Sequence, residues 1–102
     1  MGQAELGIDD CSRALSLEPD STFIADSRGW AYLRTGRFQP ALDDFNVALT
    51  RSKFTRETSL YGRSIALRQT GDTAGADADL SAARAADPNV EAELARQHVW
   101  PR

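Results

Sequence analysis

Few side chains in this sequence have the type and spacing that catalysis requires. The chain has one histidine, His98, and it lies close to the C-terminal end. Serine and cysteine nucleophiles are usually activated by a histidine that a third group orients. A single histidine beside a fraying end offers no basis for such a set, so we expect that the protein is not an enzyme.

The sequence also gives no motif for binding phosphate or metal ions. The glycines of 71–75 follow a predicted helix rather than a strand, and the lysine of a phosphate-binding loop does not accompany them. The acidic side chains of 72–79 lack the spacing of a calcium loop and instead favour the start of a helix. The single cysteine, Cys11, excludes an internal disulfide and a multi-cysteine metal site, and we expect it in the core. We therefore predict neither a metal site nor a cofactor.

The net charge of −3 is unevenly distributed along the chain. Residues 1–21 carry one basic and five acidic side chains, residues 22–71 carry eight and four, and residues 72–102 carry three and six. A basic middle between acidic ends favours a protein partner or head-to-tail self-association. Nucleic-acid binding would need a basic excess over the whole surface, so we do not expect it.

Composition and hydropathy are those of a globular chain without a membrane segment. No apolar run approaches the ~18 residues needed to span a bilayer, and residues 1–19 contain no apolar signal core. The compartment stays open, with the cytoplasm as the default expectation. Arginine outnumbers lysine eleven to one, which is typical of a GC-rich bacterial genome.

The elements that must position the side chains recur along the sequence. A spacing of 35 relates Gly36 to Gly71, Ala41 to Ala76, Phe45 to Leu80 and Ala48 to Ala83. A spacing of 34 relates the same segment backwards to Gly7, Cys11 and Ala14. Small residues recurring with a period of about 34 are typical of stacked helix–turn–helix units.

Prolines and glycines delimit six predicted helices, at 3–17, 22–34, 38–51, 56–69, 73–86 and 90–98. Pro19 and Pro88 follow two of the predicted ends, and Gly36 and Gly71 favour left-handed turns after two others. Pro40 lies in a first turn, where its missing N–H has no consequence. The last residues, 100–102, are predicted to be a frayed tail.

Three segments, 30–38 with Ala41 and Phe45, 61–88, and 6–19, resemble tetratricopeptide repeats in one common phase. The resemblance implies an all-α fold of antiparallel helix–turn–helix repeats, stacked as a short right-handed α-solenoid. Residues 1–98 would form one domain: a half repeat at 1–21, repeats at 22–56 and 57–89, and a C-terminal capping helix at 90–98, followed by a tail at 99–102. The first unit then has no first helix, so we expect either a fragment of a longer array or a contact supplied by another molecule.

In this family the first helices of the repeats line a concave groove that holds a peptide or a helix of another protein. By resemblance the groove residues here are Phe23, Asp26, Trp30, Arg34, Tyr61, Ile65, Arg68 and Gln69. Trp30 and Tyr61 would be aromatic anchors, although Trp30 would equally suit packing against a neighbouring helix. Arg34 and Arg68 are expected to point the same way and to bind carboxylates. The implied function is a protein-interaction module for a partner with acidic and apolar character.

Charged residues recur in phase on both helices of each unit. Asp10, Asp44 and Asp79 lie on predicted second helices, and Arg28 and Arg63 lie on predicted first helices. We therefore expect ion pairs between units, in a structural role.

An alternative function is homo-oligomerisation through the open N-terminal end. There Leu6, Ile8 and Leu15 would form an apolar surface without a cover. Such a contact would be two-fold and would give a homodimer.

Overall fold

The computed structural model describes residues 2–51 and 57–97, and the regular elements in these ranges are all helices. They are α1 (Gln3–Leu17), α2 (Thr22–Arg34), α3 (Phe38–Arg51), α4 (Glu57–Gln69), α5 (Thr73–Ala86) and α6 (Val90–Gln97). Four of the six predicted helices are confirmed at both ends. The predicted start of α4 at Arg56, the end of α6 at His98 and the tail at 100–102 lie outside the described residues.

Local capping accounts for the agreement at the helix ends. The Ser21 hydroxyl accepts a hydrogen bond from the N–H of Ile24 at 3.2 Å, which satisfies a free donor in the first turn of α2. Asp72 accepts in the same way at the start of α5. Gly36 and Gly71 adopt φ values of 74° and 101°, which residues with a Cβ atom rarely adopt. The left-handed turns at these two glycines end α2 and α4.

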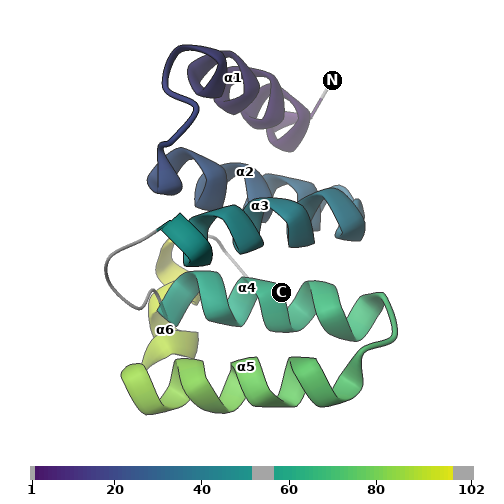
Figure 1. The fold of residues 1–102 in the computed structure, drawn as a ribbon, viewed down its shortest axis with the longest axis vertical. Helices are drawn as coiled ribbons and strands as arrows, with labels where there is room; N and C mark the ends of the chain where they lie inside the picture. The colour runs from purple at the N-terminus through teal and green to yellow at the C-terminus, as the bar shows by residue number, and fades with distance from the viewer. Residues whose placement is uncertain (1, 52–56, 98–102) are drawn as a thin grey trace.

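The helices from α1 to α5 pack in chain order, each against the next, and α2 also contacts α4 (Figure 1). This arrangement confirms the predicted all-α fold of antiparallel, sequentially stacked helices. The last helix departs from the pattern. It packs against α4, and Figure 1 shows it running steeply across the stack, beside the end of α5, rather than adding another parallel layer.

Small residues let the helices approach closely around one aromatic pair. Ala41, Ala48, Ala76 and Ala83 are each fully buried, as their recurrence predicted. The rings of Trp30 and Phe45 meet edge to face, with centroids 5.7 Å apart and planes at 78°. The same core includes Leu33 of α2, Leu60 and Ala66 of α4, and Val90 and Leu94 of α6. With Ala41 of α3 and Ala83 of α5 it joins five helices.

Two arginine–aspartate pairs bind neighbouring helices together with the same geometry. Arg28 of α2 donates to both carboxylate oxygens of Asp44 in α3, at 2.7 and 2.8 Å. Arg63 of α4 donates to Asp79 of α5 at 2.6 and 2.9 Å. The hydrogen bond to Asp44 raises the pKa of Arg28, and that to Asp79 raises the pKa of Arg63.

The expectation that these pairs join different units is wrong, because each lies within one helix pair. Contact with the preceding unit uses the remaining nitrogen of the same guanidinium. Arg28 Nη1 reaches the hydroxyl of Ser12 in α1, and Arg63 Nη1 reaches the side-chain oxygen of Asn46 in α3, both at 3.2 Å. Each arginine therefore links its own helix to the helix before it and the helix after it.

Candidate functional site

The predicted groove residues divide into three groups by exposure. Asp26 and Trp30 are buried, Tyr61 and Ile65 are half-buried, and Phe23, Arg34, Arg68 and Gln69 are exposed. Phe23 is the most exposed large apolar side chain of α2, at 67%. The structure therefore does not bring all eight together on one accessible surface.

The prediction that Trp30 contacts a partner is wrong, since only 1% of this residue is exposed. Its ring packs against Phe45, whose own ring lies against the backbone of α2 and α4. A Cβ added at Gly29 would lie 2.9 Å from Phe45 Cζ, and one added at Gly62 would be closer still. The absence of a Cβ at both glycines thus leaves room for the Phe45 ring, and Trp30 packs against that ring.

Asp26 also has a structural role, contrary to the prediction. It is 5% exposed, and the Ser59 hydroxyl donates to its Oδ1 at 2.6 Å. Ser59 lies in α4, so this buried hydrogen bond joins the first helices of successive units. The pair gave no signal in the sequence because neither residue recurs at the repeat offset of 35, where Asp26 corresponds to Tyr61 and Ser59 to Ile24.

Arg34 and Arg68 are not equivalent positions, although their spacing of 34 predicted that they are. The ends of α2 and α4 are Arg34 and Gln69, 35 residues apart, and the positive-φ glycines that follow have the same offset. Arg68 is instead equivalent to the buried Leu33. Its guanidinium donates to Asp77 of α5 at 2.7 Å.

The first turns of α4 are adjacent to α6, which therefore occupies part of the predicted groove. Val90 and Leu94 of α6 are fully buried, and Glu91 of α6 accepts a 2.7 Å hydrogen bond from Arg84 of α5. Burial raises the pKa of the Tyr61 phenol, and the Glu91 carboxylate raises it further while Arg84 opposes this effect. Tyr61 thus lies beside the α5–α6 ion pair.

Three of the predicted groove residues are exposed in the last turns of α2 and α4: Arg34, Arg68 and Gln69. Both helices run in the same direction, so their last turns lie at the same edge of the stack (Figure 1). We call Arg34, Ile65 and Gln69 the C-terminal edge. It combines a guanidinium, a half-buried apolar side chain and an amide. Such a set can bind carboxylates and apolar groups of another chain.

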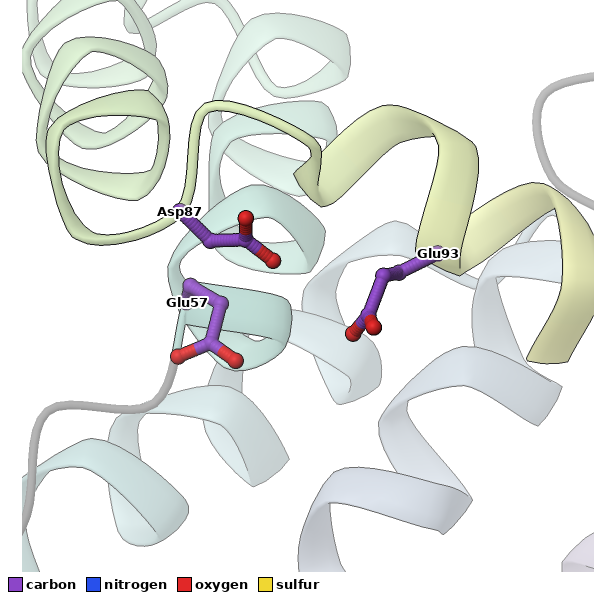
Figure 2. Close-up of side chains that lie close together, drawn as sticks. All are labelled: Glu57, Asp87 and Glu93. Carbon is purple, nitrogen blue, oxygen red and sulfur yellow. The ribbon is translucent and has the colours of Figure 1, made fainter.

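Three carboxylates that the sequence did not single out lie together near α6 (Figure 2). Oxygen atoms of Glu57, Asp87 and Glu93 are within 4.8 Å of one another, a donor set that suits hard divalent cations. Each also has a local role. Glu57 and Glu93 lie in the first turns of α4 and α6, and Asp87 accepts the N–H of Asn89 at 2.9 Å. These roles account for the three acids, and we assign no metal site.

We assign no chemistry to Cys11 or to the cleft between α1, α2 and α3. Burial raises the pKa of the Cys11 thiol, and this effect exceeds the lowering by Arg28. A cleft of about 290 Å³ opens between α1, α2 and α3, and its lining includes Leu15, Val47 and the Arg28–Asp44 pair. The charged groups of that pair already bind each other.

Comparisons with known proteins give no relative for this chain. A scan against protein-family models finds no match, and neither the curated proteins nor the solved structures contain a significant match. Within 2–51 and 57–97, every helix is too short or too polar to cross a lipid bilayer.

Proposed function

We propose that this protein is an interaction module of the tetratricopeptide-repeat type, and that its C-terminal edge binds an acidic and apolar segment of another protein. The observation that carries the proposal is the repetition of one set of contacts. Two helix pairs share the arginine–aspartate pairing, the fully buried alanines and the positive-φ glycine, all at an offset of 35. Repeated units of this kind stack into extended surfaces that other proteins use for docking.

The chemistry of the charged groups supports a binding role over a catalytic one. Arg28 and Arg63 are each held between two helices by bidentate hydrogen bonds. Cys11 is a thiol whose pKa is raised rather than lowered by its surroundings. Arg28 and Arg63 thus stabilise the scaffold, whereas Arg34 is exposed at the C-terminal edge.

The character of the partner follows from the side chains at the C-terminal edge. Arg34 favours a carboxylate, and Ile65 favours an aliphatic or aromatic side chain. Because α6 covers the first turns of α4, the segment is expected to be short and to avoid the half of the groove near Tyr61.

Selection from a displayed library of random peptides tests this function. The parent protein should enrich peptides that combine aspartate or glutamate with apolar residues. Arg34→Glu and Ile65→Glu should each raise the dissociation constant of the enriched peptides by about tenfold or more. Arg96→Glu provides a matched charge change on the exposed side of α6 and should leave binding unchanged. Enrichment without acidic residues, or binding that survives both edge variants, would refute the proposal.

A further inference from the structure

One side of α1 carries four exposed residues in a single stripe. Leu6, Asp10, Arg13 and Leu17 follow one another at intervals of four, three and four, which places them on one face of a helix. Leu6 is 50% exposed and Leu17 is 81% exposed. Together with Phe23 they are the exposed large hydrophobic residues of the described part of the chain.

The opposite face of α1 binds the rest of the fold. Ile8 is buried, Leu15 is half-buried and Ser12 accepts a hydrogen bond from Arg28. These positions lie about half a turn away from the stripe, since residues two apart on a helix point to nearly opposite sides. The stripe therefore faces away from α2. This finding revises the expected apolar surface, in which Ile8 and Leu15 stood beside Leu6.

The two leucines of the stripe are particular to α1. Asp10 corresponds to Asp44 in α3 and to Asp79 in α5, which are 5% and 8% exposed and bound by arginine. At the same offsets Leu6 corresponds to Pro40 and Gly75, and Leu17 corresponds to Arg51 and Ala86. The repeat therefore does not require leucine at either position, and within residues 2–51 and 57–97 both leucines stay largely exposed.

The order of residues in the stripe is self-complementary. It is apolar, acidic, basic and apolar, and it is symmetric about the midpoint between Cys11 and Ser12. In an antiparallel pair of α1 helices, Leu6 meets Leu17 of the second copy, and Asp10 meets Arg13 of the second copy. A two-fold axis makes each of these contacts twice. The spacing is also that of the a and d positions of a helix–helix seam.

We propose that α1 is a self-association surface, and that two copies of this chain pair antiparallel through Leu6, Asp10, Arg13 and Leu17. The four leucines supply the apolar burial, and the two ion pairs determine orientation and register. A helix of this length is about 22 Å long, so the contact is small and dimerisation should depend on concentration. In Figure 1, α1 lies at one end of the stack, with α2 between α1 and α4.

Charge reversal within the stripe tests the pairing, with mass measured by sedimentation equilibrium over a range of concentrations. The parent should dimerise as concentration rises. Asp10→Arg makes both stripe charges positive and Arg13→Asp makes both negative, so each variant alone should weaken dimerisation by about tenfold or more. An equimolar mixture of the two variants should regain the dimer, because each stripe then meets its complement. The double variant D10R/R13D should also dimerise alone.

The control is Asp9→Arg, which makes the same charge change one residue away, at another side of α1. It should dimerise like the parent, and helical circular dichroism should show that every variant folds. A parent that is monomeric at every concentration would overturn the proposal. So would a mixture of D10R and R13D that remains monomeric, or an Asp9→Arg variant as impaired as Asp10→Arg. Failure here leaves peptide binding at the C-terminal edge unaffected, so the two proposals are tested separately.

Discussion

At the scale of single residues, the same side-chain type has different roles according to the neighbours it meets. Asp44 is 7% exposed at its side chain and accepts two hydrogen bonds from Arg28. Asp77 is 71% exposed and makes one contact with Arg68. Both are aspartates on second helices that pair with an arginine of the preceding helix. Loss of the carboxylate from the buried pair should therefore destabilise the fold far more than its loss from the exposed pair.

Replacing these aspartates measures that difference. Asp44→Ala should lower the free energy of unfolding by about 2 kcal/mol, because the Arg28 guanidinium stays partly buried and loses its carboxylate. Asp77→Ala should cost less than about 1 kcal/mol. Urea denaturation of both variants and the parent provides the comparison. Equal losses would show that burial does not determine the contribution of these pairs.

Residue roles were the least predictable feature of this sequence. The recurrence of Arg28 with Arg63 and of Asp44 with Asp79 predicted ion pairs correctly, but not which helices they join. Trp30 lay on the predicted groove helix, and periodicity alone does not reveal which neighbouring ring fills the space beside it. Neither Asp26 nor Ser59 recurs at the repeat offset, so the repeat gave no indication of their hydrogen bond.

At the scale of helices, the distance between two packed helices can depend on the presence or absence of one Cβ atom. Phe45 of α3 lies against the backbone of α4 at Gly62, where an added Cβ would be well inside van der Waals contact. Gly7 lies within α1, and a Cβ added there meets nothing within 4 Å. The two glycines are both inside helices, so their intrinsic helix propensities are the same and their surroundings differ.

Substitution by alanine should therefore have opposite effects at the two glycines. Gly7→Ala should stabilise the fold by up to about 1 kcal/mol through helix propensity alone. Gly62→Ala gains the same propensity but forces α4 away from Phe45, and we expect a net loss of about 1–3 kcal/mol. Thermal and urea unfolding of both variants decide the matter. Stabilisation by Gly62→Ala would contradict the packing of Phe45 between α2 and α4.

Helix boundaries were predictable because their causes are local. Ser21, Asp72 and the two positive-φ glycines act on residues only a few positions away, so sequence patterns reveal them directly. The direction of α6 was not predictable in this way. It has eight residues and no equivalent in the repeat, and its packing against α4 depends on the tertiary burial of Val90 and Leu94.

The ionisation of Tyr61 reports whether α6 is in place. Its pKa is raised from 10.0, first by burial and then by Glu91 of α6. Leu94→Asp should detach α6 from the core and return the pKa toward its ordinary value. Ala92→Asp adds the same charge at an exposed position of α6 and should have little effect. Ultraviolet titration in a Tyr32→Phe background isolates the signal of Tyr61, and an unchanged pKa in Leu94→Asp would contradict the proximity of α6 to Tyr61.

At the scale of the whole molecule, two surfaces serve two proposed contacts. The stripe on α1 would join two copies, and the C-terminal edge of α2 and α4 would bind a partner. The two surfaces lie at different parts of the stack. They also belong to segments of opposite net charge, since residues 1–21 have an acidic excess and residues 22–71 have a basic excess. The all-α repeat fold was predictable from the period and the small residues. Which of the predicted groove residues stay exposed was not predictable, because this depends on where α6 packs against α4.

Mapping of backbone amide shifts by nuclear magnetic resonance tests the proposed function most directly. A peptide enriched by the parent protein would be titrated into the isotopically labelled chain. We predict that the largest shifts fall on the last turns of α2 and α4, around Arg34, Ile65 and Gln69, with little change over α1. Shifts confined to α1 or α6, with the C-terminal edge unperturbed, would contradict the proposed binding site.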